Sequence, residues 1–209
     1  LTQNAGQISG SVYLDGGPSH TNALGSDTFN DSAVFAGGTV LGSVFADFAS
    51  GAQVGNDAVD VTGTAISGGV DLGDGDNTFG MTAGSVGANV ESGSGVDEFR
   101  VSGGIIAGAI NSGAGEDILK LTGGAIGAGA TTGQGADSVE IDGSAITGSV
   151  DTGSEADTIT LSSGSVSASI LAGTGDDGFT WSGGSLGAGF AGGDGSDTAT
   201  VSTSNFNGA

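Results

Sequence analysis

An acidic residue recurs every 20 residues along most of this 209-residue chain. It stands fifth in a G-x-G-x-D segment, and a single asparagine, Asn77, interrupts the series. The acidic members are Asp57, Asp97, Asp117, Asp137, Asp157, Asp177 and Asp197. If the fold stacks them, neighbouring carboxylates repel by about 1 kcal/mol in water and by several times that when partly buried. A hard cation between them would remove the repulsion and take carboxylate and carbonyl oxygens as ligands, so these residues are predicted metal ligands.

The same residues have a second interpretation that needs no metal. Each Asp side chain could cap its own turn through a hydrogen bond to the nearby main chain, as in an Asx turn. The glycines at positions 1 and 3 of the segment suit both interpretations, because they let turn carbonyls face inward without a Cβ clash. At this level both interpretations stay open.

Either interpretation requires a fold that places equivalent residues on top of one another. Seven consecutive copies of the segment begin at Gly73 and continue to the copy at Gly193 without a change of phase. A fixed period near 20 residues is typical of solenoids, in which each repeat forms one coil and contacts only its neighbours. The period therefore predicts a stack of coils, with one acidic turn in each.

Apolar residues within a copy are two residues apart, which indicates strands rather than a helix. Positions 7 and 9 are predicted to point inward along a first strand, and positions 14, 16 and 18 along a second. In one copy these are Phe99, Val101, Ile106, Gly108 and Ile110. A Gly-Gly pair between them, such as 103–104, is predicted to turn the chain with φ above zero. On the outer face, Lys120 and Glu140 of neighbouring coils are expected to form an exposed ion pair.

We therefore predict an all-β fold, a parallel two-sheet β-solenoid (β-roll or β-helix) of about ten 20-residue coils. The whole chain, residues 1–209, is predicted to be one solenoid domain, with regular coils in 53–209 and looser coils in 1–52. Two insertions interrupt the looser part, at residues 15–26 and 47–52. The first contains His20, the one histidine, which has no repeated partner and is interpreted as a loop residue.

Charge and composition exclude several classes of function. Two Lys and Arg residues stand against 24 Asp and Glu, for a formal net charge of −22. Nothing could neutralise a phosphate backbone, so no nucleic acid partner is expected, and anionic membrane surfaces are disfavoured. No apolar run approaches the roughly 18 residues of a spanning helix, so this segment is not expected to insert into a membrane. The chain has no cysteine, which removes disulfides and thiolate metal sites.

Two segments carry a resemblance to a known family. Residues 113–120 (GAGEDILK) and 173–180 (GTGDDGFT) resemble the G-G-x-G-x-D-x-φ-x repeats of secreted repeats-in-toxin proteins. The resemblance implies a calcium-bound parallel β-roll, and because this chain has one acidic turn per coil, it implies calcium along one edge. That plan is also similar to the calcium-dependent ice-binding segment of a giant bacterial adhesin and to glycine-rich autotransporter passengers. The match covers 53–209 well and 1–52 loosely.

The predicted function is that of a non-enzymatic extracellular structural repeat domain. It would act as a spacer or scaffold in a bacterial surface protein, an adhesin or autotransporter passenger, and fold with calcium after export. No carboxylate pair stands out from the repeat background as a catalytic pair, and no receptor is indicated.

Two alternatives remain at this stage. One is a self-assembling S-layer or filament subunit, with end-to-end or face-to-face contacts between like solenoids or with flanking domains. The minor one is an ice-binding segment. Ice binding would require a regular outward row of Thr and Asx, but position 2 of the turn is mixed, with Asp74, Ala114 and Gln134 among its members.

Overall fold

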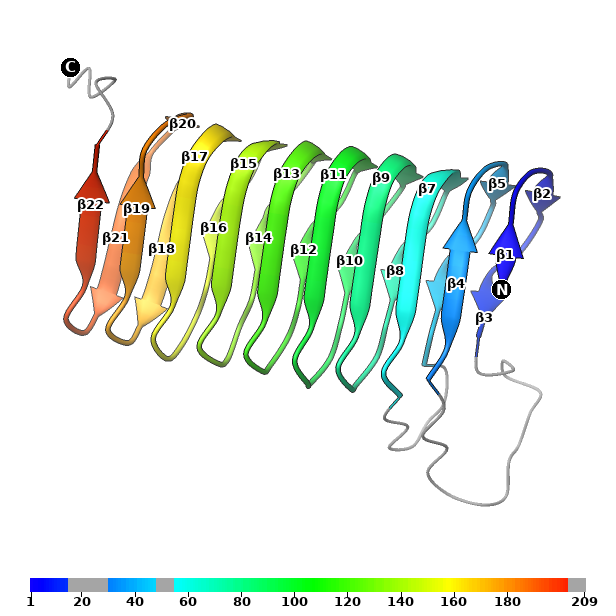
Figure 1. Cartoon of the computed structure of the whole chain (residues 1–209), viewed down its shortest axis with the longest axis horizontal. Helices are drawn as coiled ribbons and strands as arrows, with labels where there is room; N and C mark the ends of the chain where they lie inside the picture. Colours follow the sequence, from blue (N-terminus) through cyan, green and yellow to red (C-terminus); the bar gives the residue numbers. More distant parts are fainter. Residues whose placement is uncertain (15–29, 48–54, 203–209) are drawn as a thin grey trace.

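The structure is a computed structural model that describes residues 1–14, 30–47 and 55–202. These residues form short strands that wind repeatedly around one long axis, and the strands of successive coils lie side by side (Figure 1). The predicted insertion 15–26, with His20, lies outside the described residues, as does all of 47–52 except Asp47. The assignment of 1–209 to a single domain therefore stays a prediction.

The strands form two sheets, and neighbouring strands in each sheet run parallel. The 13-stranded sheet A contains β1 (Thr2–Gln3), β2 (Gln7–Ile8), β4 (Ser32–Phe35), β5 (Thr39–Val40), β7 (Ala58–Ile66), β9 (Thr78–Val86), β11 (Glu98–Ile106), β13 (Ile118–Ile126), β15 (Ser138–Ile146), β17 (Thr158–Val166), β19 (Gly178–Trp181), β20 (Ser185–Leu186) and β22 (Thr198–Val201). The nine-stranded sheet B contains β3 (Val12–Tyr13), β6 (Val44–Phe45), β8 (Val70–Asp71), β10 (Val90–Glu91), β12 (Ile110–Asn111), β14 (Ala130–Thr131), β16 (Val150–Asp151), β18 (Ser169–Thr174) and β21 (Gly189–Asp194). The predicted all-β, parallel two-sheet solenoid is confirmed.

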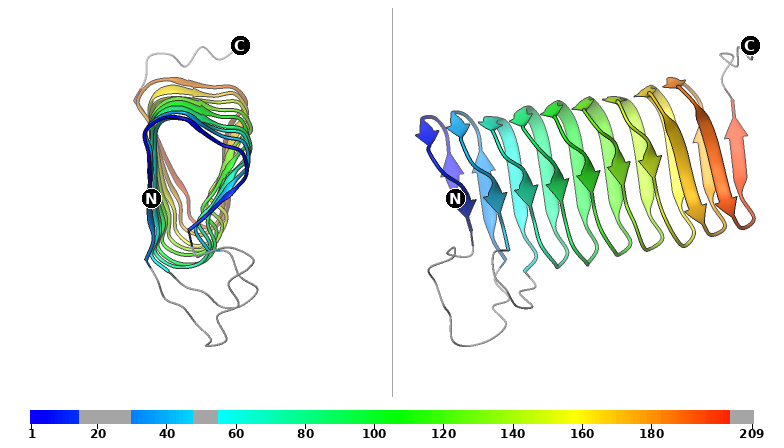
Figure 2. Two further views of the ribbon diagram at one scale, coloured as in Figure 1. Left: turned by 90° about the vertical axis from the view of Figure 1, so that its right-hand side faces the viewer. Right: turned by 180° about the vertical axis from the view of Figure 1, so that it is seen from behind.

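A narrow apolar core runs along the inside of the stack. Viewed along the axis, the coils lie one behind another around this interior (Figure 2). Positions 7, 9, 14 and 18 fill it, as predicted, because alternate side chains of a strand point to the same face. In one coil these are Phe99, Val101, Ile106 and Ile110, all at most 1% exposed. Each residue stacks on its equivalent 20 residues away, as Leu119 does on Val139 in the register of β13 and β15. Burial of this column of large side chains is the main packing interaction between coils.

The Gly-Gly pair does not turn the chain in the regular coils, although the predicted φ above zero is confirmed at its second glycine. Gly103 and Gly104 lie inside the nine-residue strand β11, where the register with β13 shifts between Val101 and Ile105. The φ of +88° at Gly104 fits a β-bulge, which bends the strand without ending it. The chain instead turns between β11 and β12, after Ile106.

Position 16 is also not in the core. Gly108 and Ala168, predicted to point inward, are only half-buried, because position 16 lies in the turn between the sheets. The buried small residue of the coil is at position 20, at the end of the short sheet B strand, where Ser112 and Thr132 are 0% exposed. Polar hydroxyls therefore line one end of the core.

The regular part of the solenoid is shorter than the predicted ten coils. The nine-residue strand recurs in β7, β9, β11, β13, β15 and β17. The β19 coil continues the same phase with a shorter strand. The coils before β7 and after β19 are less regular, so the count reaches ten only when these end coils are included.

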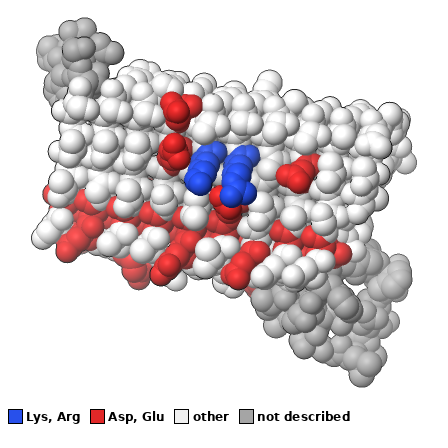
Figure 3. All heavy atoms as spheres, in the orientation of Figure 1, with Lys and Arg blue, Asp and Glu red and all other residues white. Residues whose placement is uncertain are grey.

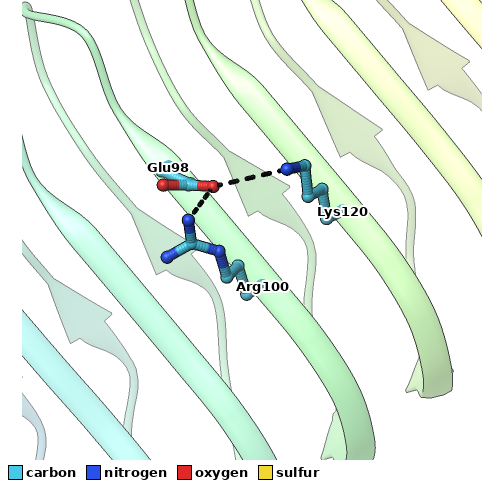
Figure 4. A network of polar contacts seen from close by, with 3 residues as sticks. All are labelled: Glu98, Arg100 and Lys120. Carbon is cyan, nitrogen blue, oxygen red and sulfur yellow. Dashed lines mark ion pairs between the residues drawn. The ribbon is translucent and has the colours of Figure 1, made fainter.

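The two basic residues lie together on the outer face of sheet A (Figure 3). Arg100 forms an ion pair with Glu98 of its own strand, and Lys120 lies 3.9 Å from the same Glu98 oxygen (Figure 4). The predicted Lys120–Glu140 pair is therefore wrong, although the two residues are register neighbours. Since both cations are about half exposed, these pairs contribute little to stability.

Among the described residues, no helix is long and apolar enough to cross a bilayer.

Candidate metal-binding edge

The predicted acidic residues lie in the turns that enter the sheet A strands, along one long edge of the solenoid. Figure 3 shows acidic side chains concentrated along this edge. Six members of the series are at most 2% exposed, namely Asp57, Asp97, Asp117, Asp137, Asp157 and Asp177. Asp197, in a less regular coil, is half-buried. The structure thus brings the predicted residues into one column, which we call the Asp column; Asn77 occupies one of its levels.

One oxygen of each carboxylate joins two coils. The main-chain N–H of Asp97 donates to Oδ1 of Asp117 at 2.9 Å, and that of Asp117 donates to Oδ1 of Asp137 at 2.8 Å. The same bond recurs along the column, from Asp31 to Asp197. A hydrogen bond to an ionised acceptor is stronger than a neutral one, so Oδ1 ties neighbouring turns together.

These hydrogen bonds correct the metal-free interpretation, in which each Asp side chain caps its own turn. The Oδ1 atoms accept hydrogen bonds from the neighbouring coil, 20 residues away, rather than from their own turn. The Asp residues therefore act in coil stacking, and this ladder uses only one of the two oxygens.

In six of these seven carboxylates the second oxygen is buried without a hydrogen-bond partner among the described residues. Among the described residues, no hydrogen bond reaches Oδ2 of Asp57, Asp97, Asp117, Asp137, Asp157 or Asp177. A buried charged oxygen without a partner is costly, because the solvation lost on burial is not replaced. Six such atoms in register form a row of buried acceptors that a cation or a proton would stabilise.

Burial changes the acidity of the column. It raises the pKa of Asp97 and of Asp157 to about 6, against partial opposition from their hydrogen bonds. It also raises the pKa of Asp57, Asp117 and Asp137. A carboxylate in this state gains free energy either by taking up a proton or by binding a cation.

A row of hydroxyls beside the Asp column was missed in the sequence analysis. Each hydroxyl at position 20 lies next to the carboxylate five residues later in the chain. It lowers the pKa of that carboxylate, but by less than burial raises it. The pairs are Ser92 with Asp97, Ser112 with Asp117, Thr132 with Asp137 and Thr152 with Asp157. Thr132 and Thr152 direct their hydrogens to main-chain carbonyls of the next coil, at 3.0 and 3.1 Å. The Oγ1 atom of each therefore lies beside the column, where it can donate its hydrogen either to that carbonyl or to the carboxylate. Strand alternation could have revealed this row, since an inward position 18 implies an inward position 20.

The available donors are all oxygens. No group of three or more His, Cys, Asp or Glu side chains converges on one point among the described residues. A cation held here would therefore be bound by carboxylate, main-chain carbonyl and hydroxyl oxygens. That donor set suits a hard ion such as Ca²⁺, which accepts six to eight oxygens in flexible geometry.

Comparison with known proteins identifies a structural neighbour. No protein-family model and no curated protein sequence matches the chain. The fold is similar to the crystal structure of a hyperactive, Ca²⁺-dependent, β-helical antifreeze protein from an Antarctic bacterium, with a TM-score of 0.55 and 23% identity. The match covers 92% of this chain and 70% of that one. It supports the β-solenoid fold; membership of the repeats-in-toxin or autotransporter families is not shown.

The outward side chains of the acidic turn form a row of mixed chemistry. The backbone at position 2 is regular, because parallel β-bridges connect successive coils there, through Ser94, Ala114, Gln134, Ser154 and Thr174 in order. Its side chains nevertheless alternate between hydroxyl, methyl and amide, and Asp74 and Asp194 lie at its ends. Position 2 therefore carries no uniform row of Thr or Asx among the described residues, and the likeness to the antifreeze protein supports the fold alone.

Proposed function

We propose that this chain is a non-enzymatic structural repeat domain of an extracellular bacterial protein, and that calcium bound along the Asp column stabilises it. The observation that carries the proposal is the set of six buried Oδ2 atoms without a hydrogen-bond partner among the described residues. Calcium would supply positive charge at these atoms. The role of the chain is to hold the oxygens in place through the coil-to-coil Oδ1 ladder.

The energetics of the edge favour this role. Buried carboxylates destabilise the folded state at neutral pH unless they are paired. The two basic side chains of the protein lie on the outer face of sheet A, where both pair with Glu98. The charge of the Asp column is therefore balanced by no side chain of the described residues, and an external cation would balance it.

An extracellular location follows from the same dependence. A fold that requires calcium stays unfolded where free calcium is scarce, as inside cells, and forms where it is abundant. Metal binding of this kind contributes its free energy directly to folding. A rigid, thin, highly charged rod suits a spacer in a surface protein such as an adhesin or autotransporter passenger.

The test is thermal unfolding of the full chain followed by circular dichroism, with millimolar calcium, with a chelator, and with magnesium as the control ion. The proposal expects a β-sheet signal and a melting temperature that rise strongly with calcium and little with magnesium, since Mg²⁺ demands a tighter, octahedral shell. Identical melting in calcium and chelator would contradict it. Concentration-dependent fibres would instead favour the self-assembling subunit.

A further inference from the structure

Asn77 differs from the six Asp residues of the column that bury an unpartnered Oδ2, because its second side-chain atom has hydrogen-bond partners. Its Oδ1 accepts the main-chain N–H of Asp57 at 2.8 Å, as an Asp does at other levels. Its backbone N–H donates to Oδ1 of Asp97, also at 2.8 Å. Asn77 therefore occupies the same place in the ladder as its acidic neighbours and differs from them in the remaining atom.

That remaining atom, Nδ2, lies among three oxygens. It is 3.0 Å from the carbonyl oxygen of Gly75, 3.2 Å from that of Gly73 and 3.1 Å from Oγ of Ser92. The orientation of the amide follows from this network, because a flipped amide would place its oxygen against three acceptors and its nitrogen against a donor.

The same position in the other coils is held by a carboxylate oxygen. Asn and Asp are nearly identical in shape, so Oδ2 of Asp117 takes the place of the Asn77 nitrogen. Its repeat has the same two glycines, Gly113 and Gly115, and a hydroxyl residue, Thr132, at position 20. An oxygen in such surroundings needs a positively charged group between it and the other oxygens.

We propose that the Asn77 amide replaces a bound cation, so that the ions along the Asp column are interrupted at this level. The inference rests on the proposed calcium function and specifies its ligands: one Oδ2, the carbonyls at positions 1 and 3, and, where it is Ser or Thr, the hydroxyl at position 20 of the same repeat. The Asn77 coil is satisfied by its own hydrogen bonds and binds no ion. The neighbouring Asp coils each depend on one.

Substitutions between Asp and Asn test this directly. Asp at a level of the column should bind an ion there, whereas Asn should replace the ion with its own hydrogen bonds. Asn77→Asp is expected to add one calcium per chain and to lower the melting temperature in chelator. Asp117→Asn is expected to remove one calcium and to raise the melting temperature in chelator. The matched controls are Asn111→Asp, on the exposed outer face of β12, and Asp142→Asn, on the exposed face of β15. Both should leave the calcium count unchanged.

Bound calcium is counted by isothermal titration calorimetry on the full chain and by elemental analysis after desalting. If the wild-type protein binds calcium but Asn77→Asp and Asp117→Asn both leave the count unchanged, the inference is overturned and the proposed function stands. If the wild-type protein binds none, the proposed function itself fails. If the Asn77→Asp variant does not fold in chelator, the number of calcium ions that it binds is measured in calcium alone. The Asp117→Asn variant then tests the inference both in calcium and in chelator.

Discussion

Asp97 and Asp117 lie one above the other in neighbouring coils, joined by a 2.9 Å hydrogen bond from the N–H of the first to Oδ1 of the second. Each also buries an Oδ2 that accepts no hydrogen bond from the described residues. The two residues therefore stabilise the stack through one oxygen and destabilise it through the other. This opposition makes the stability of the solenoid sensitive to anything that neutralises the second oxygen.

The first prediction concerns pH in the absence of calcium. Burial raises the pKa of Asp97 and Asp157 to about 6, above the usual 3.8, so between these values the folded state binds protons that the unfolded state does not. Stability in chelator should therefore increase as the pH falls from 7.5 through 6 to about 5, and be lost again as the pH rises. Melting followed by circular dichroism at each pH measures this. The range stops short of the isoelectric point near 4.1, where solubility falls.

Saturating calcium is the control for that measurement. Protons and calcium compete for the same oxygens, so with calcium present the stabilisation should shrink or reverse as the pH falls. Parallel pH curves with and without calcium would contradict the assignment of the ion to the Asp column.

The second prediction concerns the buried hydroxyl row. Thr132→Val removes an oxygen beside Asp137 and its 3.0 Å hydrogen bond to the Thr152 carbonyl, with little change of shape. We expect a loss of about 1 kcal/mol of stability in chelator from the hydrogen bond, and a several-fold weaker calcium affinity. Thr131→Val, on the exposed face of β14, is the control. Equal calcium affinity in the two variants would remove the hydroxyl from the ligand set.

The sequence was sufficient to predict the architecture because the architecture is periodic. A 20-residue phase fixes which residues stack, and two-residue spacing fixes which of them point inward, as at Phe99 and Val101. The phase also placed the Asp column along one edge. These features depend only on spacing, which the sequence states directly.

Features that depend on the path of the backbone within one coil were harder to predict. Glycine pairs suit a turn and a bulge equally well, so the position of Gly104 inside β11 could not be read from composition. The partner of each Asp Oδ1 was also misjudged, because sequence suggests local turn contacts before contacts 20 residues away. The interior hydroxyls were not predicted as site residues, although alternation from position 18 indicates that position 20 points inward.

The third prediction concerns how closely the acidic turns approach one another. Gly115 has φ of +146°, and a Cβ there would lie 1.6 Å from the carbonyl oxygen of Gly95 in the neighbouring coil. Gly115→Ala should therefore separate the coils and cost more than about 2 kcal/mol. Gly178→Ala is the matched control, because its Cβ would meet nothing closer than 3.8 Å at ordinary φ. It should be neutral or stabilise by about 0.5–1 kcal/mol. Similar melting temperatures for the two variants would disprove the close approach.

The fourth prediction concerns Glu155, which stands where the repeat has its second glycine. It is the one non-glycine residue with positive φ among the described residues, at +74°, a conformation that disfavours any side chain with a Cβ. Its carboxylate partly offsets this by accepting hydrogen bonds from Ser154 Oγ at 2.8 Å and from the N–H of Gly135 at 2.9 Å. These bonds, that from Ser154 first, lower the pKa of Glu155.

Two substitutions separate the strain at Glu155 from its hydrogen bonds. Glu155→Ala keeps the Cβ and loses both bonds, so its melting temperature should fall. Glu155→Gly loses the same bonds but relieves the backbone, and it should melt at least as high as the wild type and about 2–4 °C above Glu155→Ala. Both are measured in calcium, so that the Asp column is equally occupied. If the glycine variant melts no higher than the alanine variant, the positive φ carries no strain, and glycine at position 3 is required only for close approach of the coils.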